Sequence, residues 1–262
     1  MRGSRITLVP FLILVACDTV KETGRTRILL TSEQEEVQMG LQAYGEETKK
    51  YRVITGTKDA AMVARVAGRI AKAAEAGGYH YQWEMKLLDA PKEVNAWCLP
   101  GGKMAVYTGI LPVTQNEDAL AIVVGHEVAH ATARHGGERM TQTLEVQGVA
   151  ALIDASLSLA KVSDGVKGGT MTAFGLGANI GFLLPFSRDH ESEADEIGLR
   201  FAVRAGYDPY EAPKLWERMA KLGSGGPAFL STHPDPGDRA ERLRQMIPRI
   251  LQEEGRAKDI KK

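Results

Sequence analysis

The stretch from Val123 to Gly137 reads VVGHEVAHATARHGG, and it holds three of the six histidines of the chain. Within it, the five residues from His126 to His130 match the pattern H-E-x-x-H. Residues four apart share one face of a helix, so His126 and His130 can present two nitrogens to one metal ion. Glu127 lies one step round that helix, within reach of a water beside the metal. Two imidazoles with a neighbouring carboxylate predict a zinc site that carries out hydrolysis.

A purely structural role is the alternative for any single buried histidine. It does not explain the pair with its glutamate, because a chance match in a chain of this composition has odds of about 1 in 100. The surrounding apolar residues bury the helix, and burying two bare imidazoles and a carboxylate without partners is costly. A bound metal removes that objection. Asn116 is expected to cap this helix, Gly136 and Gly137 to end it, and Arg134 and His135 to support its end.

A second segment, SRDHESEADEIGLRFAVRAG, predicts a helix from Ser187 to Ala205 that can supply a third ligand. Glu191 and Asp195 are four residues apart and share a face, whereas Glu193 points away from Glu191. One of the two carboxylates on that face can bind zinc while the other accepts the second N–H of a ligand histidine. Glu193 and Glu196 are expected on a solvated acidic face.

The rest of the chain suits one sizeable α+β domain. It has 262 residues, 44% of them hydrophobic, and 33 basic residues balance 33 acidic ones, which excludes the basic patch that nucleic-acid binding needs. Helices are expected after Ser32, which can form a capping box with Glu35, and over 58–76. Strand-like runs follow over 80–89 and 95–111, and the pattern is helical from Asn116 onward. The pattern predicts a small sheet beside a helical body.

The N-terminus reads MRGSRITLVPFLILVAC and resembles a bacterial lipoprotein signal. An apolar run from Ile6 to Ala16 is too short to span a bilayer and has signal-peptide length. Small residues precede Cys17, which would carry the lipid. We therefore expect a signal peptide over 1–16, a tether over 17–30 and a zinc metallopeptidase domain over 31–262. A plain secretory signal and a core helix that contains Cys17 are the alternatives.

Four blocks, NAWCLPGG, HEVAH, SRDHESEAD and THPDPGDR, follow one another in this order between Ser32 and Ile250. Together they resemble the CAAX prenyl endopeptidase-type zinc metallopeptidases, the M-48 peptidase family. The resemblance implies a gluzincin fold, mostly helical with a small β-sheet bordering the active-site cleft. It further implies one catalytic zinc ion bound by His126, His130 and Glu191, with Glu127 as the general base. Asp195 matches the aspartate that supports a ligand histidine.

Within that family, the chain resembles the exported bacterial branch without transmembrane spans or a tetratricopeptide tail. The resemblance implies a zinc endopeptidase of the bacterial cell envelope that degrades misfolded or unassembled envelope polypeptides. The expected location is the periplasmic face, lipid-anchored to the inner or outer membrane. The alternatives are a lipoprotein chaperone or assembly factor with little or no proteolysis, and a hydrolase of a non-peptide bond.

Three further features of the sequence point to the cleft. NAWCLPGG resembles an edge strand beside the cleft, where Asn95 either binds substrate or caps a turn. The glycine-rich segment 164–182 is either a flap over the cleft or a plain connection. His233 precedes Pro234 and therefore sits in a non-helical turn, with Asp235 and Pro236 expected to start a helix. The resemblance places His233 beside the zinc, as a fourth ligand at rest or as a donor to the oxyanion; a resting ligand is favoured.

Overall fold

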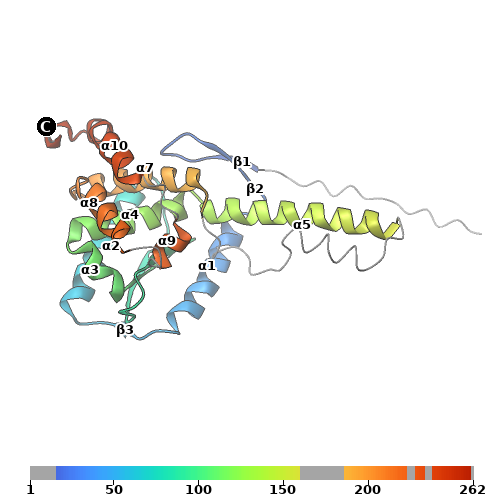
Figure 1. Ribbon diagram of the computed structural model, residues 1–262, viewed down its shortest axis with the longest axis horizontal. Helices are drawn as coiled ribbons and strands as arrows, with labels where there is room; N and C mark the ends of the chain where they lie inside the picture. The colour runs from blue at the N-terminus through green and yellow to red at the C-terminus, as the bar shows by residue number, and fades with distance from the viewer. Residues whose placement is uncertain (1–15, 160–185, 223–227, 234–237, 261–262) are drawn as a thin grey trace, which may run out of the picture.

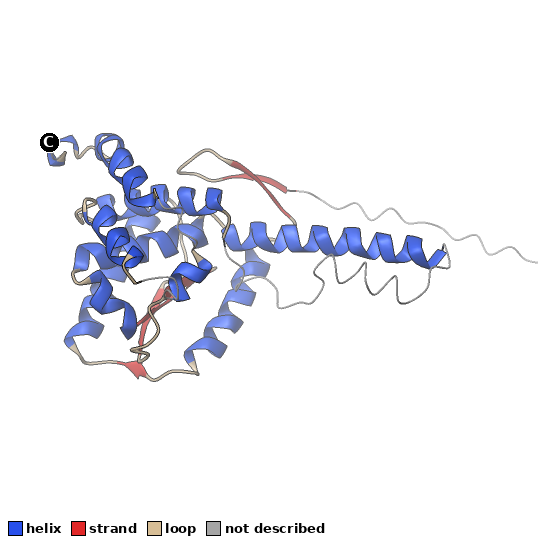
Figure 2. Ribbon diagram, viewed as in Figure 1, coloured by secondary structure: helices blue, strands red, loops and turns tan. Residues whose placement is uncertain are grey.

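The computed structural model describes residues 16–159, 186–222, 228–233 and 238–260, and it confirms a mostly helical fold with small sheets (Figure 2). The strands are β1 (Ala16–Thr19), β2 (Thr26–Leu29), β3 (Val53–Ile54), β4 (Glu84–Leu88), β5 (Ala96–Leu99) and β6 (Lys103–Tyr107). The helices are α1 (Glu33–Thr48), α2 (Lys58–Ala76), α3 (Leu111–Thr114), α4 (Glu117–Thr132), α5 (His135–Leu159), α7 (Arg188–Arg204), α8 (Glu211–Ala220), α9 (Ala228–Thr232) and α10 (Arg239–Glu253). Short 3₁₀ helices cover Thr108–Ile110 and Ala257–Asp259. The glycine-rich segment 164–182, either a flap or a plain connection, lies outside the described residues.

The larger sheet places β5 at an edge, as the NAWCLPGG block predicts. Its strand order is β3-β4-β6-β5, with β6 parallel to β4 and antiparallel to β5. The chain reverses between β5 and β6 at Gly101 and Gly102, whose φ angles of 84° and 83° favour glycine. One side of β5 therefore pairs with β6, and β5 also contacts α4, the helix that carries the H-E-x-x-H pattern.

Helix α4 runs through the middle of the hydrophobic core. Every residue from Ala119 to Thr132 is buried, and the Asn116 side chain caps the helix by accepting the Ala119 N–H at 2.8 Å. The predicted end at Gly136 and Gly137 is wrong, because α4 stops at Thr132 and both glycines lie in α5. The chain breaks at Arg134, which has a left-handed φ of 55°.

A contact between distant residues explains this early end. The Arg134 guanidinium donates to Glu36 Oε2 at 3.0 Å and to the Thr31 carbonyl at 2.8 Å. Glu36 is buried on α1, so the strained residue is fixed by a helix about a hundred positions earlier in the chain. The resulting bend turns α5 away from α4, and α5 then projects from the body (Figure 1).

Helix α7 agrees with its predicted bounds. Ser187 caps it by accepting the His190 N–H at 3.1 Å, and Gly206 follows its end with a φ of 82°. The capping box of Ser32 and Glu35 is likewise present at the start of α1. Both helix starts follow from short-range signals, so the sequence suffices to predict them.

The N-terminal strands β1 and β2 form an antiparallel hairpin that covers most of the expected tether and begins at Ala16, the last residue of the expected signal peptide. Cys17 pairs with Ile28 across it, and Val20 in the turn region is fully buried at 0% exposure. The hairpin thus packs on the body (Figure 1). Residues 1–15 lie outside the described part, so the signal peptide, the boundary at residue 31 and the lipid on Cys17 stay predictions. Among the helices described, none combines the length and apolar character needed to cross a bilayer.

Candidate metal centre

Four side chains from three parts of the fold converge on one point. His126 and His130 come from α4, Glu191 from α7, and His233 from the residue that follows α9. All four are buried, and one ligand atom from each lies within 4.8 Å of the others. His126 Nε2 is 3.0 Å from His130 Nε2, and the Glu191 carboxylate lies 3.4 Å from both nitrogens. Of the acidic residues on α7, Glu191 therefore faces the histidine pair.

The donor set fits a zinc ion. Three imidazole nitrogens and a carboxylate share one buried place, and a cation between them would accept a lone pair from each. Glu127 Oε1 is buried and has no hydrogen-bond partner within the described part of the chain. A water held by a metal would satisfy this oxygen. Nitrogen and oxygen donors of this kind are those that zinc prefers.

The two charged neighbours of His126 set its protonation and orientation. His126 Nδ1 lies 3.1 Å from Asp195 Oδ1, so the ring turns Nε2 towards the other donors. Burial lowers the pKa of His126, but the Glu191 and Asp195 carboxylates overcome it and raise the value to about 9. Burial raises the pKa of Glu127, although the nearby His233 and His126 rings oppose it. Glu127 Oε1 is 3.4 Å from His233 Nε2.

Arg239 was not singled out by the sequence, yet it is central to the site. It is 1% exposed and donates from Nη1 to Glu191 Oε2 at 2.9 Å and from Nη2 to Asp195 Oδ1 at 2.6 Å. Its guanidinium carbon lies 3.4 Å from the centre of the Trp216 ring. One buried cation thus holds the Glu191 and Asp195 carboxylates in place. The THPDPGDR block contains Arg239, but nothing local to that block indicates its partners.

His233 lies against the ligand cluster. Its Nδ1 is 2.9 Å from Glu191 Oε1 and 3.3 Å from His126 Nε2. The Phe229 N–H of α9 donates to the Val94 carbonyl at 3.2 Å, which places this segment at the start of edge strand β5. The described helix α10 begins at Arg239, and residues 234–237, where Asp235 and Pro236 were expected to start it, lie outside the described part.

Asn95 is occupied locally. Its Oδ1 accepts the Ala96 N–H at 2.9 Å, and its carbonyl accepts the Tyr107 N–H at 3.1 Å. Both hydrogen bonds are to residues of the sheet, one to the first residue of β5 and one to the last residue of β6. A role of Asn95 in substrate binding stays a prediction.

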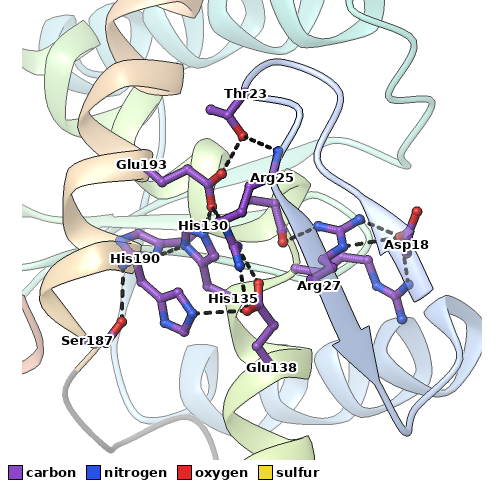
Figure 3. A network of polar contacts seen from close by, with 12 residues as sticks. Asp18, Thr23, Arg25, Arg27, His130, His135, Glu138, Ser187, His190 and Glu193 are labelled. Atoms are coloured by element: carbon purple, nitrogen blue, oxygen red, sulfur yellow. Dashed lines mark hydrogen bonds and ion pairs between the residues drawn. The ribbon is translucent and has the colours of Figure 1, made fainter. Parts of the chain in front are cut away.

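The expectation of a solvated Glu193 is wrong. Glu193 is 8% exposed, and its Oε2 lies 2.9 Å from His135 Nε2 and accepts from Arg25 Nε at 2.8 Å. Glu196 is partly exposed and pairs with the buried Arg200 and the exposed Arg249. Glu193 points away from Glu191 on helix α7, but its side chain lies under the hairpin, beside Thr23 and Arg25, rather than in solvent (Figure 3).

His135, Glu138 and His190 form a second buried group whose donor atoms lie within 4.8 Å of one another. The His135 and His190 rings stack with centroids 4.4 Å apart, and His190 Nε2 is 3.3 Å from Glu138 Oε2. The Arg25 guanidinium already binds here, because it donates to Glu138 at 2.8 Å and to Glu193 at 2.8 Å. The group therefore forms a hydrogen-bond network around Arg25.

Comparison with known proteins identifies the relatives of the chain. Residues 57–247 match Peptidase family M48. The mitochondrial metalloendopeptidase OMA1 of Schizosaccharomyces pombe is 40% identical over 219 residues, covering 81% of this chain and 61% of that protein. OMA1 of Arabidopsis thaliana is 42% identical, covering 62% of this chain and 31% of that protein. The β-barrel assembly-enhancing protease of Escherichia coli is 31% identical, covering 61% and 34%. The chain thus spans less than two thirds of each of these relatives.

These relatives correct one prediction and confirm another. The predicted bacterial cell-envelope location is wrong, because the relatives at 40% and 42% identity are mitochondrial by name and the bacterial protease matches at 31%. The exported bacterial branch within the family is not supported either. All four sequence blocks that predicted the M-48 peptidases fall inside the matched residues 57–247. That match covers most of the 262 residues, and the chain therefore belongs to Peptidase family M48.

Proposed function

We propose that this chain is a zinc-dependent endopeptidase. The observation that carries the proposal is the convergence of His126, His130 and Glu191, with a Glu127 carboxylate oxygen beside them that has no hydrogen bond within the described part of the chain. The relatives named above as metalloendopeptidases support the same reaction class. Three protein ligands that leave room for a further position are typical of catalytic zinc sites, whereas structural sites use four.

The chain's own residues divide the chemistry between them. When bound, zinc supplies positive charge that acidifies a water and polarises the scissile carbonyl. Glu127 accepts the proton of the attacking water and then donates it to the leaving amine. The raised pKa of Glu127, caused by burial, suits a group that must both take and return a proton. Asp195 and Arg239 hold the ligand side chains in position throughout.

The substrate we propose is an extended segment of an unfolded polypeptide. Strand β5 lies at the edge of its sheet and contacts α4, the helix that carries His126 and His130. An extended peptide can add to such an edge through its main chain, which requires no particular sequence but does require local unfolding. Folded proteins cannot present that strand, so the enzyme acts on unassembled or misfolded chains.

His233 is proposed to occupy the ligand cluster at rest. Its Nδ1 lies within hydrogen-bonding distance of Glu191, and the α9 segment that carries it contacts the start of β5. A substrate that adds to β5 would have to displace this segment. Displacement would free the His233 ring to donate to the oxyanion instead.

Proteolysis of one unfolded protein and one folded protein of similar size tests the proposal. The expected result is cleavage of the unfolded protein alone, loss of activity with a zinc chelator, and recovery when zinc is added. Cleavage that persists after complete zinc removal would refute the metal mechanism. Equal cleavage of the folded protein would refute the proposed substrate class.

A further inference from the structure

We propose that His135 and Glu193 are positioning residues for the zinc ligand His130, and that the N-terminal hairpin completes this support through Arg25. The inference rests on the proposed zinc binding at His126, His130 and Glu191. A line of hydrogen bonds leaves the metal centre from His130 and passes through His135 to Glu193. Figure 3 shows this line running from α4 through α5 and α7 to the hairpin.

The line begins at the second nitrogen of the ligand ring. His130 Nε2 faces the donor cluster, 3.0 Å from His126 Nε2, so Nδ1 points the other way. His130 Nδ1 is 2.9 Å from His135 Nδ1, and His135 Nε2 is 2.9 Å from Glu193 Oε2. Three buried side chains thus form one continuous series of contacts.

The carboxylate at the far end fixes the direction of every proton in that series. Glu193 Oε2 accepts, so His135 Nε2 must be the N–H that donates to it. His135 Nδ1 is then the bare nitrogen of a neutral ring, and it accepts the N–H of His130 Nδ1. His130 consequently keeps a lone pair on Nε2, which is the form that binds a metal. The opposite order would leave an N–H of His130 pointing at the ion.

The two ligand histidines are therefore supported in different ways. His126 Nδ1 reaches a carboxylate directly, because Asp195 Oδ1 lies 3.1 Å away. His130 reaches its carboxylate, Glu193, through an intervening ring. That ring is held on its face as well, since His135 stacks on His190 with centroids 4.4 Å apart and planes 16° apart.

Glu193 is in turn fixed by the hairpin. Thr23 Oγ1 donates to Glu193 Oε1 at 2.5 Å, and Arg25 Nε donates to Oε2 at 2.8 Å. Arg25 also donates through Nη1 to Glu138 Oε2 at 2.8 Å, which anchors its guanidinium on α5. Thr23 and Arg25 lie between β1 and β2, outside residues 57–247 that match the family. A segment beyond the family region thus contributes to the metal centre.

Zinc affinity is the measurement that tests the inference. Glu193→Gln keeps the size of the side chain but removes the charge that fixes the proton order, so zinc binding should weaken about tenfold or more. Glu196→Gln is the matched control, because Glu196 lies on the same helix and its carboxylate pairs with Arg200 and Arg249. Its zinc affinity should equal that of the unaltered chain. Competition with a chromophoric chelator of known affinity gives each dissociation constant.

A double variant separates positioning from a general structural effect. His135→Phe keeps a ring to stack on His190 but cannot accept the N–H of His130. If Glu193 acts through His135, adding Glu193→Gln to His135→Phe should weaken zinc binding no further. Two independent, additive losses would overturn the inference. So would a folded Glu193→Gln variant with unaltered zinc affinity.

Arg25→Met tests the contribution of the hairpin. It should weaken zinc binding less than Glu193→Gln, because Thr23 still holds the carboxylate. Thermal unfolding of each metal-free variant identifies any that fail to fold. If Glu193→Gln or His135→Phe does not fold, Arg25→Met carries the test, because the Arg25 side chain is partly exposed and its replacement disturbs the core less. Arg25→Met with unaltered zinc affinity would refute the role of the hairpin. An unaltered chain that binds no zinc at all would instead refute the proposed function.

Discussion

Gly125 on α4 and Gly198 on α7 lie directly against each other. A Cβ atom on Gly125 would stand 2.7 Å from the Gly198 carbonyl oxygen, and one on Gly198 would stand 2.7 Å from the His126 backbone nitrogen. The two helices that supply zinc ligands therefore cross with their backbones in contact. This close approach brings Glu191 within reach of the α4 histidines, and it tolerates no side chain at either position.

Gly198→Ala should accordingly destabilise the fold and separate the ligands. The added methyl group meets backbone atoms, which cannot move aside as a flexible side chain would, so we expect a loss of about 1–3 kcal/mol in unfolding free energy. Gly68→Ala is the control, because no atom lies within 4 Å of a Cβ there and Gly68 sits inside α2. That variant should gain about 0.5–1 kcal/mol. Denaturant unfolding gives the free energy of unfolding of both variants. A Gly198→Ala variant as stable as the unaltered chain would contradict the close crossing of α4 and α7.

Glu127→Gln should keep zinc and lose activity. Glu127 is adjacent to the donor cluster without belonging to it, so the amide removes the proton acceptor and leaves the ligands intact. The turnover number should fall about 100- to 10,000-fold. Metal analysis and cleavage of an unfolded protein measure the two quantities. Wild-type cleavage by this variant would show that another group is the base.

Glu191 and Glu193 should differ sharply in their effect on bound zinc. Glu191→Ala removes a ligand and also leaves Arg239 with one carboxylate partner fewer, so zinc should be lost. Glu193→Ala removes only the support of His130, so zinc should be retained with weakened affinity. The two variants are compared by measuring bound zinc per protein after gel filtration at equal protein concentration. Loss of zinc from Glu193→Ala alone would reverse the assignment of the third ligand.

The sequence predicted those parts of the site that depend on local signals. The spacing of His126 and His130 needs only the helical repeat, and the caps of α4 and α7 need only a side chain within three residues. Helix α4 ends four residues before its glycines because Arg134 binds Glu36, a contact that no local pattern contains.

The missed residues share the same physical reason. Arg239 reaches Glu191 across 48 positions of sequence, and Arg25 reaches Glu193 across 168. An acidic residue such as Glu193 on a polar helix is usually solvated, and only the hairpin packed over it makes it buried. Tertiary contacts overrode the local preference at each of these places. The arginines could have been suspected only from the number of acidic residues that α7 brings into the core.

His233→Ala provides the test of the resting state. The His233 ring lies 2.9 Å from Glu191 Oε1 and 3.4 Å from Glu127 Oε1, between the ligand cluster and the catalytic carboxylate. A resting ligand must leave before substrate binds, so its removal should raise the rate at low substrate concentration and leave zinc bound by the other three ligands. His80→Ala is the control, because His80 is exposed.

Cleavage of an unfolded protein over a range of concentrations, with zinc content measured in parallel, gives the answer. A faster His233→Ala variant with full zinc supports a closed resting state, since only an inhibitory contact is relieved by truncation. A variant about 100-fold slower with full zinc would assign His233 to the oxyanion instead, because a donor lost from the transition state lowers the turnover number. Unchanged kinetics would exclude both roles and leave the His233 ring as a packing element between Phe229 and the donor cluster, where the two rings stack 4.5 Å apart.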